Sequence, residues 1–208
     1  MTDGQDAEHL ELRIPWCEVV ALVAERGWAS VAGAIGPALI DELSTDERRE
    51  WRVHGDEGVA HQLLYGAYLP LLEARPPVRQ LAQGLMTGLS EAASRRGLPP
   101  VPAFNEVSWG RYPPGIGQIT AHRDPSAYGG VIAIFTLRGA ADFRVFEDDG
   151  TVTEWEVSPG HLVILRGVEW PHAKVRRPVH EVGTPTGEER SIITLRANRR
   201  GSRARSVA

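Results

Sequence analysis

Residues 131–166, VIAIFTLRGAADFRVFEDDGTVTEWEVSPGHLVILR, decide the prediction of the fold. Apolar and polar residues alternate along short runs rich in β-branched and aromatic side chains, and turn residues separate the runs. This is the pattern of successive β-strands. The tripeptide Asp148-Asp149-Gly150 between two of the runs favours a tight hairpin. We therefore predict strands over 131–137, 142–147, 151–157 and 161–166.

Further strands are predicted on both sides of this segment, over 104–112, 116–122, 172–176 and 190–197. About eight short strands without intervening helices favour a sandwich or barrel, and eight suits a jelly roll, also called a double-stranded β-helix. Residues 1–100 read mostly as helix, with helices expected over 15–26 and 37–50. The clearest helical stripe follows Pro76-Pro77 and consists of Val78, Leu81, Leu85, Leu89 and Ala92. The predicted fold is mainly β, with N-terminal helices supporting one outer face of the roll.

The 208 residues are expected to form one domain. Residues 1–100 are its helical support region, 101–198 its β-helix core, and 199–208 a disordered basic tail. The single cysteine, Cys17, lies among apolar residues and is expected to be buried. No apolar run is long enough to span a membrane and the N-terminus lacks a signal pattern, so we expect a cytoplasmic protein. The sequence leaves the oligomeric state open.

A possible metal site lies at the end of a predicted strand. His122 and Asp124 are two positions apart and project to the same face, so one imidazole and one carboxylate can bind the same ion. Fifty residues later, His172 opens another predicted strand. Two histidines and one carboxylate form the ligand set of non-haem Fe(II) sites. The alternative is that His122 and Asp124 belong to a turn and that His172 is a hydrogen-bonded core residue.

The last predicted strand carries two arginines on one face, Arg190 and Arg196, together with Ile192 and Thr194. If this face points inward, two unpaired buried cations would be costly, and a bound dicarboxylate could neutralise both. If it points outward, the arginines are simply solvated. The strand pattern alone does not decide between these two orientations.

The segments NEVSWGRYPPGIGQITAHRD (105–124), VIAIFTLRGAADFRVF (131–146), SPGHLVILRGVEWPHAKV (158–175) and ERSIITLR (189–196) occur in a characteristic order. In order and spacing they resemble the iron(II)/2-oxoglutarate-dependent dioxygenases, and within them the AlkB-like branch. The resemblance covers about residues 105–197. It implies a double-stranded β-helix enzyme that uses Fe(II), 2-oxoglutarate and O2 to oxidise a C–H bond, with release of succinate and CO2.

The resemblance also implies roles for individual residues. It makes His122, Asp124 and His172 the iron ligands and Tyr112 a hydrogen-bond partner of 2-oxoglutarate. Arg190 would bind the distal carboxylate of 2-oxoglutarate, and Arg196 would lie nearer the carboxylate that chelates iron. Four residues that flank the ligands are candidates for substrate contact: Trp109, Arg123, Tyr128 and Trp170.

Some positions depart from the family pattern. Gly110 and Ile192 stand where nucleic-acid repair members have asparagines, and one extra residue lies between Tyr112 and His122, so we expect a differently lined pocket. His161 replaces an aspartate and is expected at the surface. A halogenase of the same fold would lack the carboxylate ligand, so Asp124 favours hydroxylation or demethylation.

The charge distribution bears on the substrate. Residues 1–60 carry 13 acidic and 5 basic side chains, and the segment 51–68 has aromatic residues but only Arg52 as a base, which opposes phosphate binding. We therefore expect a small-molecule substrate. Alternatives are an alkylated nucleobase, for which the arginine-rich tail could bind phosphate, and a cupin-like metal-binding protein without turnover.

Overall fold

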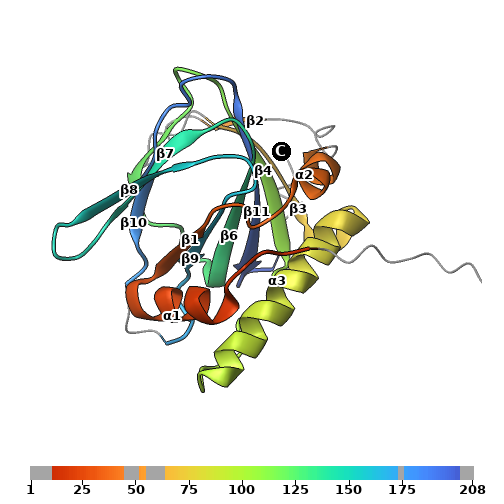
Figure 1. The fold of residues 1–208 in the computed structure, drawn as a ribbon, viewed down its shortest axis with the longest axis vertical. Coiled ribbons are helices and arrows are strands. Elements are labelled where there is room, and N and C mark those ends of the chain that lie inside the picture. The colour runs from red at the N-terminus through yellow and green to blue at the C-terminus, as the bar shows by residue number, and fades with distance from the viewer. Residues whose placement is uncertain (1–10, 45–51, 55–63, 173–175, 202–208) are drawn as a thin grey trace, which may run out of the picture.

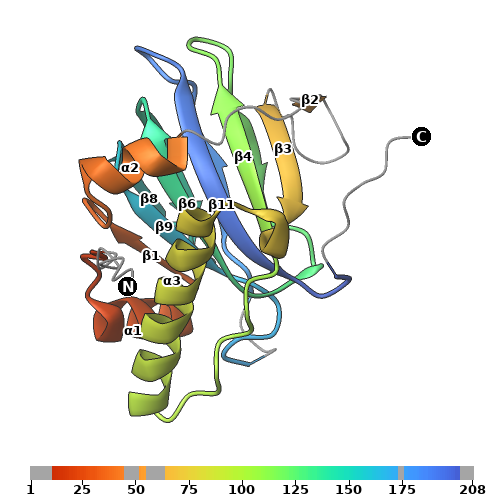
Figure 2. The same ribbon diagram turned by 90° about the vertical axis from the view of Figure 1, so that its right-hand side faces the viewer.

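The computed structural model describes residues 11–44, 52–54, 64–172 and 176–201. Two antiparallel sheets face each other, and the helices cover the outer face of the larger one (Figures 1 and 2). This arrangement is a double-stranded β-helix supported by helices, which confirms the predicted fold class. No helix in the described ranges is long and apolar enough to cross a membrane.

The major sheet has the strand order β1-β9-β6-β11-β4-β3-β2. Its strands are β1 (Trp28–Val31), β9 (Leu162–Arg166), β6 (Tyr128–Arg138), β11 (Arg190–Asn198), β4 (Glu106–Tyr112), β3 (Leu64–Pro70) and β2 (Arg52–His54). Three of these, β1, β2 and β3, come from the region read as helical. They add strands to the two edges of the major sheet: β1 pairs with β9, and β3 pairs with β4 and β2. These pairings depend on partners that are distant in the sequence, so the local pattern did not predict them.

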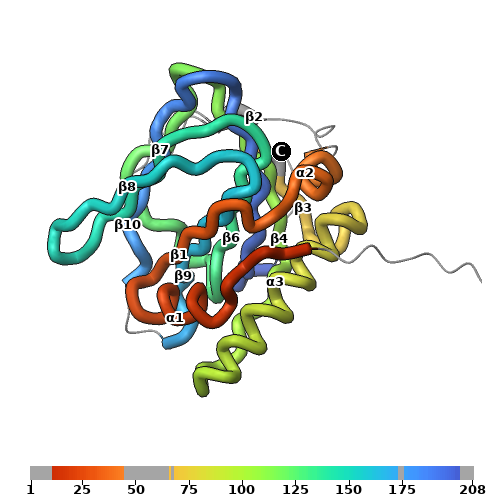
Figure 3. The backbone as a smooth tube through the Cα atoms, viewed as in Figure 1, coloured from red at the N-terminus to blue at the C-terminus, as the bar shows by residue number. Residues whose placement is uncertain are grey.

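The minor sheet has the strand order β5-β10-β7-β8. Its strands are β5 (Ile119–His122), β10 (Val179–Val182), β7 (Ala141–Phe146) and β8 (Val152–Val157). The β7–β8 hairpin predicted from Asp148-Asp149-Gly150 is present and extends away from the body of the molecule (Figure 3). At the other edge of this sheet, β5 pairs with β10 and brings residues 119–122 and 179–182 side by side.

Two apolar cores hold the layers together. The first lies between the major sheet and the helices, and it includes Ile164, Ile193 and Leu195. The second lies between the two sheets and includes Phe143 and Val163. Because strand side chains alternate between faces, Ile193 and Leu195 in the first core place Arg190, Ile192, Thr194 and Arg196 on the face towards the minor sheet.

The helices follow the predicted pattern. Helix α1 (Trp16–Arg26) ends at Gly27, whose left-handed φ of 92° suits glycine. Helix α3 (Pro76–Arg95) begins with two prolines and buries all five residues of the predicted stripe. Gly88 lets α3 pack against α1, since a Cβ there would lie 2.4 Å from the ring of Trp16. Helix α2 (Pro37–Ser44) is shorter in the structure than predicted, and residues 45–50 lie outside the described ranges.

Two expectations about the chain ends differ from the structure. Cys17 is exposed rather than buried, because α1 turns Val19, Val20 and Val23 inward and leaves Cys17 on its outer side. At the C-terminus, Arg199 is tied to the fold by an ion pair with Glu169 at 2.6 Å. Residues 199–201 of the predicted tail thus belong to the described fold, and residues 202–208 lie outside the described ranges.

Candidate metal centre

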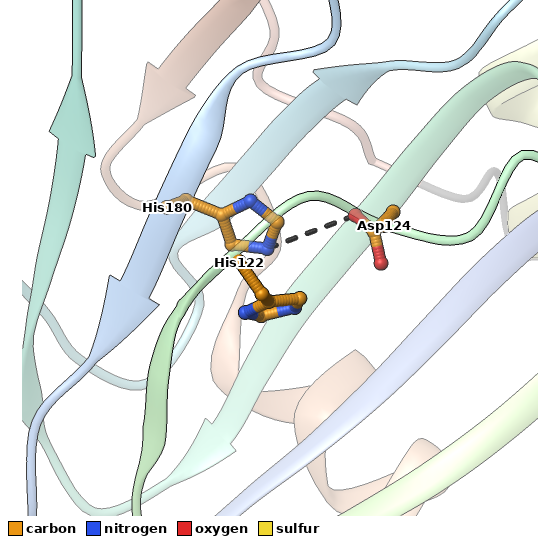
Figure 4. Close-up of side chains that lie close together, drawn as sticks. All are labelled: His122, Asp124 and His180. Atoms are coloured by element: carbon orange, nitrogen blue, oxygen red, sulfur yellow. Dashed lines mark ion pairs between the residues drawn. The ribbon is translucent and has the colours of Figure 1, made fainter. Parts of the chain in front are cut away.

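Three side chains with metal-binding atoms converge on the inner side of the minor sheet (Figure 4). They are His122 at the end of β5, Asp124 just beyond it, and His180 on β10. One ligand atom from each lies within 4.8 Å of the others, and Nε2 of His180 is 3.7 Å from Oδ2 of Asp124. Residues 122 and 180 are direct cross-strand partners, so the sheet register brings the two imidazoles together.

The backbone orients both imidazoles. Nδ1 of His122 lies 2.8 Å from the carbonyl oxygen of Thr120, and Nδ1 of His180 lies 3.4 Å from that of Pro178. A carbonyl oxygen can only accept, so Nδ1 of each ring is the donor, and Nε2 is the ring nitrogen that points towards a metal. The ring of His180 also stacks on Phe143, with centroids 5.7 Å apart.

The protonation state of His180 suits metal binding. Burial lowers the pKa of His180 to about 4, so the imidazole is neutral at neutral pH, the form that binds metals. Two imidazoles and a carboxylate on one face form the ligand set typical of non-haem Fe(II). The chemistry of these donors therefore fits an iron ion.

His172, the expected second histidine, does not join this cluster, and His180 takes its place. His172 is exposed and has no regular secondary structure, and the predicted strand 172–176 is not a strand at its described residues. The strand forms at 179–182 instead, after Pro178, because proline lacks the N–H that a paired strand requires. The signal was the Val-His-Glu-Val pattern of 179–182, whereas His172 follows a proline and precedes alanine and lysine.

Arg190 is a buried cation with unused donors. The residue is 1% exposed. Its Nη2 donates to Oγ1 of Thr136 at 3.1 Å, whereas Nε and Nη1 have no hydrogen-bond partner among the described residues. Burial lowers the pKa of Arg190. Because a buried guanidinium with free donors is costly, this site fits a carboxylate ligand with forked hydrogen bonds.

Arg196 has a different environment at the other end of the same strand face. Its Nη1 lies 3.8 Å from Oε1 of Glu106 and donates to the hydroxyl of Ser108. The rings of Tyr68 and Tyr128 flank the guanidinium, with centroids 5.6 and 5.1 Å away. Six residues of strand separate the two arginines by roughly 20 Å along the backbone. Arg196 thus has a carboxylate partner in Glu106, whereas Arg190 has no carboxylate partner among the described residues.

The other predicted site residues divide between the inner face and the core. Tyr112 lies beside Arg190, whose Cζ is 5.1 Å from its ring centroid, and burial raises the pKa of Tyr112 to about 12. Burial also raises the pKa of Tyr128 to about 12, and the charge of Asp124 acts in the same direction. Arg123 is exposed, and its Nε donates to the carbonyl oxygen of Arg177 at 3.0 Å.

The two predicted tryptophans, Trp109 and Trp170, are core residues and not part of the site. Both are at least 97% buried and belong to the core beneath the helices. Trp109 occupies an odd position on β4 and so faces away from Tyr112, and the indole of Trp170 donates to the carbonyl oxygen of Pro99 at 2.8 Å. Neither ring can contact a substrate at the triad.

His161 is buried rather than exposed, contrary to the expectation. Its Nε2 lies 2.6 Å from the hydroxyl of Ser30, and burial lowers the pKa of His161. The unfolded chain therefore binds more protons than the folded chain below the ordinary histidine pKa of about 6.5. Through this residue, stability should be complete above that pH and should fall as the pH is lowered through it.

We expect His161→Gln to reduce this pH dependence. The melting temperature of the wild type should fall between pH 7 and pH 5, and the variant should show a shallower fall because it loses one of the groups that must be neutral in the folded state. Thermal unfolding followed by circular dichroism at both pH values measures this. Parallel pH profiles for the two proteins would show that His161 does not contribute.

No protein-family model matches the sequence, and no curated protein is significantly similar to it. Solved structures do match. A prolyl-4-hydroxylase from Pseudomonas putida is 24% identical, with a TM-score of 0.65 over 88% of this chain and 99% of its own. A 2OG-Fe(II) oxygenase family oxidoreductase from Burkholderia pseudomallei is 14% identical, with a TM-score of 0.64 over 94% and 96%.

A third similar structure is OsALKBH1, which is 14% identical, with a TM-score of 0.59 over 83% of this chain and 98% of its own. The three matches cover nearly the whole length of the proteins compared. At these identities they establish the fold, and the chain has the double-stranded β-helix fold of the 2OG-Fe(II) oxygenases.

Proposed function

We propose that the protein is an Fe(II)/2-oxoglutarate-dependent dioxygenase that oxidises a C–H bond of a small molecule, with hydroxylation or demethylation as the result and release of succinate and CO2. The observation that carries the proposal is the convergence of His122, Asp124 and His180 within 4.8 Å on the inner face of an oxygenase fold. Arg190 supports it, because it is buried on the facing sheet and its Nε and Nη1 have no partner among the described residues.

In this proposal, the triad binds the metal and Arg190 binds the cosubstrate. His122, Asp124 and His180 would hold the iron, and their backbone contacts fix the ring orientation. Iron bound there would supply the activation of O2, coupled to decarboxylation of 2-oxoglutarate. Arg190 would bind the distal carboxylate of the cosubstrate beside Tyr112.

Apolar side chains would line the space between the arginine and the triad. Ile192 packs with Tyr112, and Ile119 and Ile134 pack against this pair from the two sheets. Such a lining excludes water and strengthens the charge interactions of Arg190 with a bound diacid.

Three basic side chains of this part of the roll, Arg123, Arg196 and Arg199, are already engaged, which supports a small-molecule substrate. Glu106 pairs with Arg196, Glu169 pairs with Arg199, and Arg123 donates to a backbone carbonyl. Nucleic-acid binding relies on arginines and lysines that are available to phosphates. The acidic 51–68 segment, whose charge also opposes phosphate binding, lies largely outside the described ranges, so its contribution rests on the sequence alone.

The second candidate is an AlkB-like demethylase of alkylated nucleic acid. The observation that favours it is Tyr68, which is 41% exposed beside Arg196, since exposed aromatic rings can stack on an extracted base. A catalytically silent metal-binding protein is the third reading. The unused donors of Arg190 disfavour it, because they call for an anionic cosubstrate.

Substrate-dependent succinate release, measured across metabolites, prolyl peptides and methylated oligonucleotides, tests these readings. We expect a small molecule to stimulate turnover and oligonucleotides to bind weakly. Binding is compared across a salt series for the full chain and for a chain that ends at Gly201, which keeps Arg199 in place. Salt-dependent oligonucleotide binding that survives the truncation and is coupled to demethylation would favour the second candidate instead.

A further inference from the structure

Reciprocal hydrogen bonds join the two loops that flank the triad. The guanidinium of Arg177 donates to the backbone carbonyl oxygen of Asp124. In return, Nε of Arg123 donates to the backbone carbonyl oxygen of Arg177 at 3.0 Å. Arg123 directly precedes Asp124, and Arg177 lies three residues before His180. The loop after β5 and the loop before β10 are therefore cross-linked beside the candidate ligands.

This cross-link reinforces a weak part of the sheet. Strands β5 and β10 have only two register pairs, 180 with 122 and 182 with 119, and the pairing is irregular between them. Asp124 lies beyond the end of β5, so no ladder hydrogen bond of that strand fixes it. Metal ligands need to be held within about 0.5 Å of their productive geometry. The carbonyl contact from Arg177 supplies a restraint at this residue.

A third arginine anchors the same loop to the major sheet. Arg166 at the end of β9 is 1% exposed, and its Nη2 donates to the backbone carbonyl oxygen of Arg176. Its own backbone N–H donates to the carbonyl oxygen of Gly27 at 2.8 Å. Hydrogen bonds from Arg166 on β9 and from Arg123 after β5 thus restrain the backbone of residues 176–177. This restraint fixes the position from which Arg177 donates to the carbonyl oxygen of Asp124.

We propose that Arg177 is a positioning residue for the metal centre, which sets the place of the Asp124 carboxylate relative to the imidazoles of His122 and His180. The proposal rests on the proposed function, in which these three residues hold the metal. Arg177 acts through the backbone of Asp124, and its carbonyl contact leaves the carboxylate oxygens for the ion. The return hydrogen bond from Arg123 keeps the two loops in register.

The sign of the expected effect separates positioning from simple electrostatics. Removing a positive charge near a cation site should strengthen the binding of a divalent cation. Loss of a positioning contact should weaken it, typically by about 10–100-fold for residues that orient metal ligands. Arg176 offers a matched control, since it lies in the same loop and carries the same charge. Among the described residues, its side chain pairs with the exposed Asp148, at 3.9 Å.

The experiment measures Co(II) affinity of the full chain by titration, together with the Co(II) absorption spectrum and the melting temperature. Arg177→Ala should weaken Co(II) binding by about 10–100-fold and change the spectrum, whereas Arg176→Ala should bind Co(II) at least as tightly as the wild type. Arg177→Lys, which can still donate to the Asp124 carbonyl, should recover part of the affinity. Arg123→Ala, which removes only the return bond, should weaken binding less than Arg177→Ala.

Equal Co(II) affinities and spectra for Arg177→Ala and Arg176→Ala would overturn the positioning role while leaving the metal site in place. A lower melting temperature with unchanged affinity would overturn it in favour of a purely structural role. If Arg177→Ala does not fold, Arg177→Lys and Arg123→Ala decide, and unchanged binding in both refutes the proposal. Absence of Co(II) binding by the wild type would instead refute the proposed function.

Discussion

His180→Ala is expected to abolish Fe(II)-dependent succinate production, whereas His172→Ala should leave it close to the wild-type value. Removing a ligand should reduce turnover by at least about a hundredfold, since even residues that only orient ligands contribute 10–100-fold. His172 is exposed and lies outside the cluster, and surface substitutions of this kind have small effects. His122→Ala and Asp124→Ala should resemble His180→Ala.

The two histidine variants form a matched pair because each removes one imidazole from the segment between β9 and β11. Circular dichroism spectra and direct Fe(II) titration show whether each variant folds and binds the metal. Loss of activity in His172→Ala with retention in His180→Ala would contradict the assignment of His180 as a ligand.

Arg190→Lys is expected to weaken 2-oxoglutarate binding by roughly tenfold or more, which corresponds to about 1.4 kcal/mol. Lysine keeps the charge but loses the planar fork that binds a carboxylate through two hydrogen bonds. The same change at Arg196 should have a smaller effect on the cosubstrate, because Glu106 already pairs with that guanidinium. Titration of 2-oxoglutarate into the metal-loaded protein under anaerobic conditions measures both.

Fe(II) affinity serves as the control for these variants and should change little. If Arg196→Lys weakens 2-oxoglutarate binding and Arg190→Lys does not, the cosubstrate lies at the other end of β11. If neither does, the inner face of this strand does not bind the diacid.

The alternation of apolar and polar residues predicted most strands of the β-helix core, because this pattern is local to each strand. It also predicted His122, Asp124 and the shared face of Arg190 and Arg196, since residues at i and i+2 on a strand necessarily share a face. Trp109 could have been excluded by the same rule, because it differs in parity from Tyr112. Its position on the strand before the ligands therefore gave no reason to expect it beside them in the fold.

The error at His172 has a different origin. The segment 167–178 contains two prolines, and its apolar residues alternate over two short stretches, Val168/Trp170 and Ala173/Val175, so the position of the next strand was ambiguous locally. The register with β5, which pairs 180 with 122, is a long-range property. In the same way, β1 and β3 form only because β9 and β4 offer them free edges.

A crystal structure of the protein grown anaerobically with Mn(II) and 2-oxoglutarate tests the central claim most directly. The account predicts one anomalous metal peak bound by Nε2 of His122, Nε2 of His180 and the carboxylate of Asp124, with the distal carboxylate of 2-oxoglutarate on Arg190. A metal bound elsewhere, or a triad that stays metal-free at saturating Mn(II), would contradict it.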